Sequence, residues 1–272
     1  MRLLRWFALA MALLAAAELG TAQQVSGAPQ VNARAAVLME AKTGQVLWAK
    51  DQNRRLAPAS TTKIMTALLA LEKVPISKVV TVSENASKAD GSSLWLEPGE
   101  KLTVEELLYG AMLNSGNDAC VALAETVSGS EADFAKLMTA RARKLGATAT
   151  TFMNANGLPA AGHLTTAYDM ALITRAALAN PVFAAIAETK VKNIPWPGKD
   201  WDRRLINHNK LLWRYEGADG VKTGYTRESG HCLVASATRD GRQLIAVVLR
   251  SRDTYGETST LLDYGFKQYK LV

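Results

Sequence analysis

Residues 58–67 read Pro58-Ala59-Ser60-Thr61-Thr62-Lys63-Ile64-Met65-Thr66-Ala67. Apolar side chains continue after Ser60 with helical spacing, and no helix breaker occurs before Pro75. The pattern predicts a helix with Ser60 at its N-terminus. Residues three apart share one face of a helix, so the Lys63 amine can reach the Ser60 hydroxyl. The stretch therefore predicts a serine nucleophile with a lysine base beside it.

A second string, Ser115-Gly116-Asn117, lies between two predicted apolar helices. The first of these, residues 103–113, begins with a capping box formed by Thr103 and Glu106. The second covers residues 118–127. The serine and the asparagine are therefore expected at a rigid junction between two helices.

The third string is Lys222-Thr223-Gly224, which follows the turn-forming pair Asp219-Gly220. Two apolar runs come next, residues 232–237 and 244–249, joined by Arg239-Asp240-Gly241-Arg242. This is a hairpin pattern, so the third string is expected on the edge of an antiparallel sheet. In this order the three strings form the S-x-x-K, S-x-N and K-T-G set of serine acyl-transferases.

Two similar strings have different settings. Lys42-Thr43-Gly44 lies between the alternating apolar stretches 35–40 and 45–49, which predicts the turn of a hairpin. It also precedes the Ser60 motif, which is the wrong order for the set. Ser83-Glu84-Asn85 lies in a polar run and is predicted to be a surface loop.

The N-terminus has the pattern of a targeting segment. Arg2 and Arg5 precede an apolar run over residues 6–17, and Gly20-Thr21-Ala22 resembles a cleavage site. We expect a signal peptide at 1–22, a linker at 23–34 and one catalytic domain at 35–272, in an exported, extracytoplasmic protein.

The whole chain has 272 residues and a formal net charge of +7. Its basic residues are scattered, without a recognition helix or aromatic platform, which argues against nucleic acid binding. Cys120 and Cys232 each lie in an apolar run, and free buried thiols are favoured over a disulfide. The three histidines lack metal-ligand spacing, so no metal or other cofactor is expected.

The chain resembles the D-alanyl-D-alanine carboxypeptidases of peptidase family S11, which are low-molecular-weight penicillin-binding proteins. The resemblance covers about residues 33–270. It is carried by residues 58–67 together with Asn114-Ser115-Gly116-Asn117-Asp118-Ala119-Cys120, Asp219-Gly220-Val221-Lys222-Thr223-Gly224-Tyr225-Thr226 and Leu261-Leu262-Asp263-Tyr264-Gly265-Phe266. It implies the mixed α/β fold of β-lactamases and transpeptidases, an antiparallel sheet flanked by helices with an inserted all-helical lobe. Many members continue into a β-rich domain and a C-terminal amphipathic anchor, neither of which is expected here.

The resemblance also implies a role for each matching residue. Ser60 is the expected nucleophile, Lys63 its base, Ser115 a proton relay, and Asn117 the residue that orients Lys63 and the substrate amide. Lys222, Thr223, Gly224 and Tyr225 are expected to bind the substrate, a peptidoglycan stem peptide ending in D-Ala-D-Ala. Penicillins and other β-lactams are expected as covalent inhibitors.

The basic residue that binds the substrate carboxylate is less well defined. Some family members place a basic residue within an Asn-x-Asn string, which here reads Asn207-His208-Asn209. His208 is the candidate, with a purely structural loop histidine as the alternative. Other members use an arginine near the last helix, where this chain has Thr254. Arg250 and Arg252 are nearby, and solvent exposure is the expected role for both.

The remaining aromatic and imidazole side chains are expected to be structural. His163 is placed in a loop before a helix, and His231 at the start of a strand near the rim of the cleft. Core packing or loop anchoring is favoured over substrate binding for four tryptophans: Trp95, Trp196, Trp201 and Trp213.

Three other functions remain open. A class A β-lactamase shares the motifs but needs a glutamate that activates water, and the string Asn154-Ala155-Asn156-Gly157-Leu158 has no acidic residue. A DD-endopeptidase that cuts cross-links differs in the shape of its pocket. A non-catalytic wall-binding or β-lactam-sensing module does not need the complete catalytic set that this chain retains.

Overall fold

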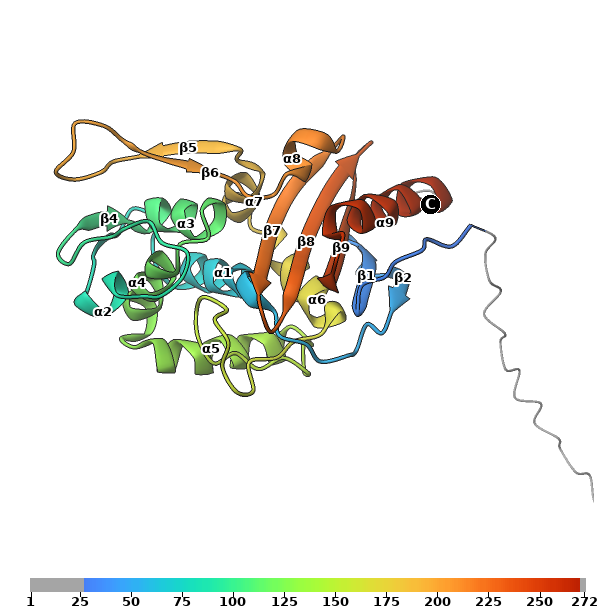
Figure 1. Cartoon of the computed structure of the whole chain (residues 1–272), viewed down its shortest axis with the longest axis horizontal. Coiled ribbons are helices and arrows are strands. Elements are labelled where there is room, and N and C mark those ends of the chain that lie inside the picture. Colours follow the sequence, from blue (N-terminus) through green and yellow to red (C-terminus); the bar gives the residue numbers. More distant parts are fainter. Residues whose placement is uncertain (1–26, 270–272) are drawn as a thin grey trace, which may run out of the picture.

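A five-stranded antiparallel sheet forms one half of the computed structural model, which describes residues 27–269 (Figure 1). The strand order is β2-β1-β9-β8-β7. The strands are β1 (Ala35–Glu40), β2 (Val46–Lys50), β7 (Ala218–Thr226), β8 (Gly230–Arg239) and β9 (Arg242–Ser251). Distant parts of the chain therefore build the sheet, and β7 is an edge strand, both as predicted.

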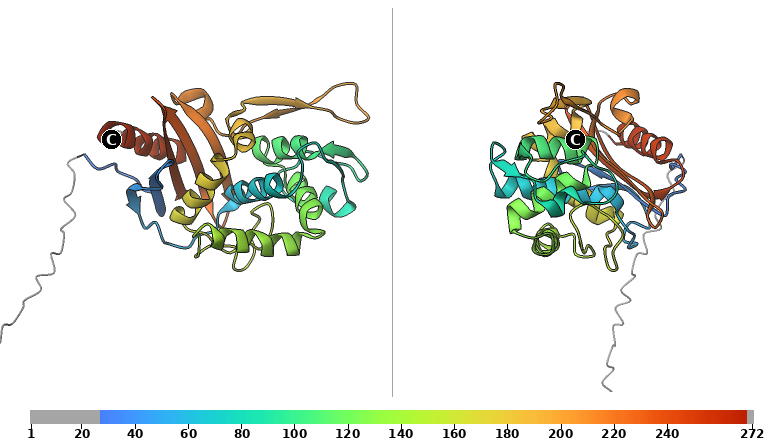
Figure 2. Two further views of the ribbon diagram at one scale, coloured as in Figure 1. Left: turned by 180° about the vertical axis from the view of Figure 1, so that it is seen from behind. Right: turned by 60° about the vertical axis from the view of Figure 1, so that its left-hand side comes forward.

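Helices cover both faces of the sheet (Figure 2). Helix α9 lies against one face, and the lobe made by the middle of the chain lies against the other. The helices are α1 (Lys63–Lys73), α2 (Glu84–Ser87), α3 (Val104–Leu113), α4 (Asn117–Ser128), α5 (Glu131–Lys144), α6 (Ala167–Leu178), α7 (Pro181–Glu188), α8 (Leu211–Arg214) and α9 (Thr254–Gln268). A short 3-10 turn, Ala59–Thr62, leads into α1.

The alternation of side chains along β1 divides the core into two parts. Val37 and Met39 point into the larger cluster, between the sheet and the lobe. Ala36 and Leu38 point into a smaller cluster that packs against α9. Successive side chains of a strand face opposite sides, so one apolar strand serves two cores. Helix α1 runs through the larger core and is buried from Lys63 to Ala70, which holds its first turn in a fixed place.

The predicted junction on either side of Ser115 is present. Helix α3 begins with the predicted capping box, in which Thr103 Oγ1 accepts a hydrogen bond from the Glu106 amide and the Glu106 carboxylate accepts one from the Thr103 amide. Helix α3 ends at Leu113 with Asn114 as its C-cap, and α4 begins three residues after this cap, at Asn117. Two rigid helices therefore fix the position of the S-x-N string.

The inserted lobe is not made of helices alone. It also contains two ribbons of two strands each, β3 (Val79–Thr81) with β4 (Lys101–Thr103) and β5 (Val191–Ile194) with β6 (Arg203–Ile206). Their three- and four-residue strands are too short to give a clear alternating pattern in sequence.

The prediction of a surface loop at Ser83-Glu84-Asn85 is wrong. Ser83 caps α2 by accepting a hydrogen bond from the Ala86 amide, and its hydroxyl donates to Glu125 on α4 at 2.6 Å. The short helix depends on this tertiary contact, which a local sequence pattern does not reveal.

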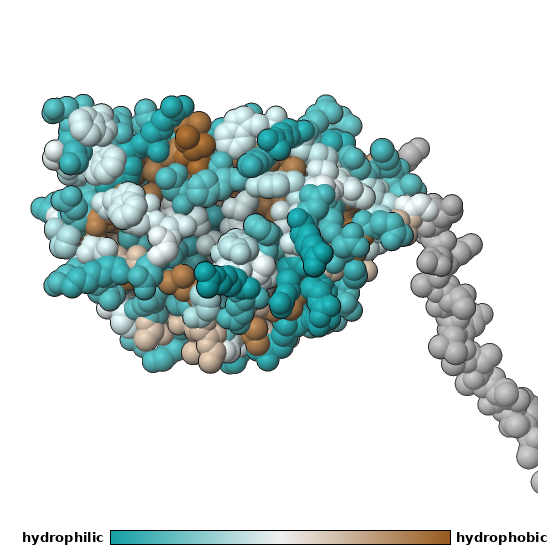
Figure 3. Space-filling view, in the orientation of Figure 1, coloured by the Kyte–Doolittle hydropathy of each residue, from teal (hydrophilic) through white to brown (hydrophobic). Residues whose placement is uncertain are grey.

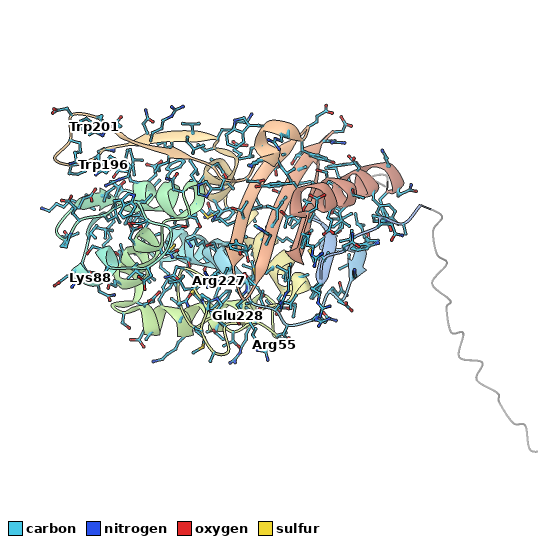
Figure 4. All side chains as sticks on the ribbon, viewed as in Figure 1. Arg55, Lys88, Trp196, Trp201, Arg227 and Glu228 are labelled. Atoms are coloured by element: carbon cyan, nitrogen blue, oxygen red, sulfur yellow. The ribbon has the colours of Figure 1, made fainter. Side chains whose placement is uncertain are left out.

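The prediction for the tryptophans is wrong at three of the four positions. Trp95 and Trp201 are 74% and 63% exposed, and Trp213 is also exposed. Only Trp196 is anchored, because the guanidinium of Arg203 lies 4.7 Å from its ring centre. Trp196 and Trp201 both lie in the long connection between β5 and β6 (Figure 4).

The predicted signal peptide, residues 1–22, lies outside the described residues. Among the helices at 27–269, no single one is long and apolar enough to cross a membrane. Helices α6 and α7 would pass such a test only as a pair, and they meet at a bend of 107°.

Candidate active site

Ser60 lies in the 3-10 turn that leads into α1, at the predicted amino end of the helix. The turn is held by Thr61, whose hydroxyl donates to the Pro58 carbonyl at 2.7 Å. The residue before the serine, Ala59, adopts a left-handed conformation with a φ of 49°. The Ser60 side chain lines a cleft rather than the core. Its Oγ lies 3.0 Å from Lys63 Nζ, as the three-residue spacing predicts.

Lys63 is buried, and two further acceptors surround its amine. Nζ donates to Asn117 Oδ1 at 2.7 Å and to the Asn156 carbonyl at 2.7 Å. Burial lowers the pKa of Lys63 to about 8, although nearby Cys120 and Asp118 act in the opposite direction. A lysine with a pKa near neutrality exists partly as the free amine, which is the form that can accept a proton from a serine.

Asn117 connects Lys63 to the helical lobe. Its Oδ1 accepts from Lys63, while its Nδ2 donates to the Asp90 carbonyl at 2.5 Å. Its backbone amide donates to the Ser92 carbonyl at 2.7 Å. With its amide held at both ends, Asn117 fixes the direction in which Lys63 Nζ points.

Ser115 reaches the same cleft from a strained position. It has a φ of 63° in the short connection between α3 and α4. Such backbone strain persists only where the surroundings enforce it, often at functional sites. Within residues 27–269, the Ser115 hydroxyl makes no hydrogen bond to Lys63 or Lys222, so the structure does not show the proton relay expected from sequence.

Lys222 lies buried on β7, with its Nζ donating to the Thr223 carbonyl at 3.1 Å. Burial, assisted by the positive charge of Lys63, lowers the pKa of Lys222 to about 7. Near neutral pH, both lysine amines can therefore gain or lose a proton.

Gly224 permits the sheet to approach the nucleophile closely. A Cβ at this position would lie 3.0 Å from the Ser60 nitrogen and 3.0 Å from the Ala59 Cβ. Any larger residue would push β7 away from the 3-10 turn. The glycine therefore lets the backbone of β7 lie close to the backbone amide of Ser60.

The cleft has a volume of about 330 Å³. Its walls come from the helical lobe on one side and from β7, β8 and the start of α9 on the other. They comprise Ser60, Ser92, Ser115, His208, Thr223, Gly224, Tyr225, His231, Cys232, Thr254 and Tyr255. Six of the predicted site residues line it, whereas Lys63, Asn117 and Lys222 lie buried beneath its surface. No Asp or Glu lines it among the described residues.

Sequence reasoning missed Ser92 and Tyr255 as cleft residues. Ser92 is placed there by the contact of its carbonyl with the Asn117 amide. Tyr255 donates from its hydroxyl to the His208 carbonyl at 2.9 Å. Both contacts are long-range, and neither residue belongs to a motif that would have marked it.

His208 lies at the cleft with its backbone held in place. Its amide donates to the Leu113 carbonyl at 3.3 Å, and its carbonyl accepts from Tyr255. The flanking side chains are also fixed, since Asn209 Nδ2 donates to the Gly220 carbonyl at 2.7 Å. Partial burial and the charge of Lys222 lower the pKa of His208, which disfavours a cationic ring at neutral pH.

The other predicted structural residues lie as expected. Cys120 and Cys232 are both free and buried. His163 is buried and accepts from the Met153 amide at its Nδ1, 3.0 Å away. Its neutral ring therefore carries the proton on Nε2 and donates to Thr62 Oγ1 at 2.9 Å. His231 stacks on Tyr225 at the rim, with 4.4 Å between ring centres.

Arg250 and Arg252 do not line the Ser60 cleft. They line a larger groove beside it, which also includes Tyr225 and His231. Thr254 occupies the cleft in their place. In the part of the chain that is described, no group of three or more His, Cys, Asp or Glu side chains is arranged to hold a metal.

Comparison with known proteins places this arrangement in context. A family model described as D-alanyl-D-alanine carboxypeptidase, peptidase S11, matches residues 21–253. D-alanyl-D-alanine carboxypeptidase DacF of Bacillus subtilis (strain 168) is 43% identical over 88% of the chain and 63% of that relative. DacC of Escherichia coli (strain K12) is 40% identical over 92% of the chain and 65% of that relative. The chain thus spans somewhat less than two thirds of the length of both relatives.

Solved structures with similar folds agree with these matches. An evolved putative penicillin-binding protein homolog, Rv2911, from Mycobacterium tuberculosis superimposes with a TM-score of 0.85 and 34% identity, over 90% of this chain and 95% of that one. The Streptomyces K15 DD-transpeptidase superimposes with a TM-score of 0.82 and 33% identity, over 88% of this chain and 98% of that one.

Proposed function

The chain belongs to the S11 family of D-alanyl-D-alanine carboxypeptidases, and we propose that it removes the terminal D-alanine from peptidoglycan stem peptides that end in D-Ala-D-Ala. One observation carries the proposal: Ser60 Oγ, exposed to a cleft, lies 3.0 Å from the amine of a buried lysine whose pKa is lowered to about 8. This is the geometry of an activated nucleophile.

Acylation begins at the carbonyl between the two D-alanines. Ser60 Oγ attacks the carbonyl carbon while its proton passes to the neutral Lys63 Nζ. The carbonyl oxygen becomes an oxyanion, and the backbone N–H groups of Ser60 and Tyr225 are the donors that stabilise it. Preorganised donors of this kind usually contribute the largest electrostatic share of the rate.

The tetrahedral intermediate then loses its amine. Breaking the C–N bond requires a proton on the departing D-alanine nitrogen, and Ser115 passes one to it from the lysine pair. Lys222, whose pKa is lowered to about 7, lies beside this relay and carries positive charge when it is protonated. Asn117 holds both Lys63 and the substrate amide. Thr223 binds the free carboxylate, assisted by His208 when its ring is protonated.

Water completes the cycle by attacking the ester carbonyl on Ser60, and the lysine pair accepts a proton from the water. The C–O bond to Ser60 then breaks, and the Ser60 oxygen takes that proton back. A bound penicillin leaves no separate amine, because its leaving group stays tethered to the acyl chain. The described residues that line the cleft include no Asp or Glu to activate water. The penicillin ester is therefore expected to persist, which distinguishes the protein from a class A β-lactamase.

Action outside the cytoplasm, after removal of residues 1–22, is part of the proposal. It is supported by the relatives, which are named D-alanyl-D-alanine carboxypeptidases, and by the basic start of the chain, Arg2 and Arg5. Stem peptides are then the partners, and β-lactams the covalent inhibitors.

Mass spectrometry of a stem pentapeptide incubated with the protein tests the activity. Release of one D-alanine is expected, and a Ser60→Ala variant of unchanged melting temperature should show neither release nor labelling by fluorescent penicillin. Cleavage of a cross-linked peptide dimer without release of D-alanine would instead identify an endopeptidase. Rapid release of hydrolysed penicillin would identify a β-lactamase.

A further inference from the structure

A groove of about 1010 Å³ lies next to the active-site cleft. Tyr225 and His231 line both the groove and the cleft, so the two are continuous. The other residues lining the groove are Asn32, Arg34, Arg227, Gly230, Arg250, Ser251, Arg252, Asp253 and Glu257. Four arginines from three separate parts of the chain therefore surround one hollow that opens beside the nucleophile.

The two acidic residues of the groove are already engaged by backbone amides. Asp253 caps α9 by accepting from the Gly256 amide at 3.0 Å. Glu257 accepts from the Asn32 amide at 2.7 Å and from the Ala33 amide at 3.2 Å. Glu257 joins α9 to the N-terminal segment, and Asp253 caps α9 itself. Neither carboxylate is ion-paired with an arginine of the groove, so four arginines against two carboxylates leave an excess of positive charge there.

The four arginines have exposed side chains, and within residues 27–269 none of them pairs with a carboxylate. Four unpaired positive charges raise the local concentration of anions. They also bind a carboxylate when the rest of the ligand holds that carboxylate beside them. Figure 3 shows strongly hydrophilic residues gathered beside the lower ends of β8 and β9, where the groove opens. Figure 4 shows Arg227 at the end of the β7–β8 hairpin.

Arg250 lies at a bulge in the sheet. The register between β8 and β9 shifts between His231 and Leu233, so that β9 carries one extra residue there. Arg250 has a φ of 55° at this bulge. Bulges re-aim side chains and occur often beside active sites. A non-glycine residue in this conformation is strained, and its side chain lines the groove.

The direction of the substrate decides which of its groups would meet the groove. Thr223, assigned above to the terminal carboxylate, lies two residues before Tyr225 on β7, and Arg227 lies two residues after it. A peptide extended along β7 with its carboxylate at Thr223 therefore directs its acyl side toward Arg227. At about 3.3 Å per residue, Arg227 lies roughly 7 Å beyond the oxyanion hole.

We propose that this groove, lined by Arg34, Arg227, Arg250 and Arg252, is an acyl-side subsite for a free carboxylate two residues before the penultimate D-alanine of the substrate. The inference rests on the proposed activity and adds a preference to it. It concerns the part of the substrate that remains on Ser60, whereas His208 and Thr223 contact the part that leaves.

Two isosteric peptides test the subsite: acetyl-Glu-(Nε-acetyl-Lys)-D-Ala-D-Ala and its counterpart with Gln in place of Glu. D-Alanine release gives kcat/KM for each, and the acid peptide is expected to be preferred about two- to fivefold at low salt, the range of an exposed charge contact. The preference should shrink in 0.5 M salt, because screening weakens exposed charge pairs.

Matched variants show which arginines cause the preference for the acid peptide. Arg227→Gln and Arg252→Gln should each lower the acid-to-amide ratio, and the double variant should bring it close to one. Arg143→Gln removes an equally exposed charge from the end of α5 and should leave the ratio unchanged. Equal kcat/KM for the two peptides in the native protein would overturn the subsite, as would a ratio that both variants retain. If neither peptide loses D-alanine, the proposed activity itself fails, and the subsite fails with it.

Discussion

Lys63 and Lys222 share one buried site, and the positive charge of Lys63 helps to lower the pKa of Lys222 to about 7. Burial is the larger cause for both lysines. Two cations in one low-dielectric site do not both remain charged easily, so one of the amines is available as a base near neutral pH. In the proposed mechanism, the pair performs the task that a histidine performs in other serine hydrolases.

Acylation should depend on pH through Lys63. Its pKa of about 8 means that the neutral, reactive amine increases as the pH rises toward 8. The second-order rate constant for labelling by fluorescent penicillin should therefore rise by about tenfold per pH unit below 8 and then level off. Stopped-flow or quenched labelling between pH 5.5 and 9 measures this. A constant rate from pH 6 to 8 would exclude Lys63 as the base.

Asn117→Asp should move that profile toward alkaline pH. The substitution replaces the neutral Oδ1, 2.7 Å from Lys63 Nζ, with a carboxylate. An adjacent negative charge favours the ammonium form and raises the pKa of Lys63, by about one unit or more. The rate at pH 7 should fall about tenfold or more and recover partly at high pH. Asn193→Asp, on an exposed position of β5, is the matched control and should leave the profile in place.

Gly224→Ala should impair acylation more than folding. The new Cβ would lie 3.0 Å from the Ser60 nitrogen and 3.2 Å from the Pro58 carbonyl oxygen, so β7 and the 3-10 turn must separate. A displacement at an oxyanion hole costs about 100-fold in rate, whereas an edge strand absorbs the shift with about 1–2 kcal/mol of stability. Labelling rates and urea unfolding measure the two effects separately. A variant with normal labelling would show that the close approach is not needed.

His163 should make the protein less stable in acid. Burial lowers the pKa of His163 to about 4, below the ordinary value near 6.5, so the unfolded chain binds the proton more readily than the folded one. Stability is complete above about pH 6.5 and decreases as the pH falls toward 4, by up to about 3 kcal/mol. Unfolding by urea at pH 4.5 and 7 should show a smaller pH dependence in His163→Gln. An identical dependence in that variant would assign the acid sensitivity to other groups.

The part of the site that follows local rules was predictable from sequence. The three-residue step from Ser60 to Lys63, the capping box at Thr103 and the edge position of Lys222 each depend on a helix or hairpin pattern that neighbouring residues determine. The placement of these strings around one cleft followed from the resemblance to a family, because no local pattern states which helix faces which strand.

The parts that were missed depend on long-range contacts. The Asn156 carbonyl accepts from Lys63 across 93 residues of sequence. It belongs to a loop whose sequence indicates only the absence of an acidic residue. The cap of α2 at Ser83 needs Glu125 from another helix. Exposure of Trp95 and Trp201 follows from the course of loops that lack periodicity. Contacts of backbone carbonyls, and helix caps that depend on another helix, cannot be recognised from the spacing of side chains in the sequence.

The pairing of β1 with β9 joins strands that lie about 200 residues apart. Closing so large a loop early is entropically unfavourable, so contacts of this kind slow folding and tend to form late. Ser60 and Gly224 are also far apart in sequence, and they meet only when β7 packs against the 3-10 turn. Covalent labelling by penicillin therefore reports on the last stage of folding. During refolding from denaturant, reactivity with penicillin should appear after most of the helical circular dichroism signal has recovered.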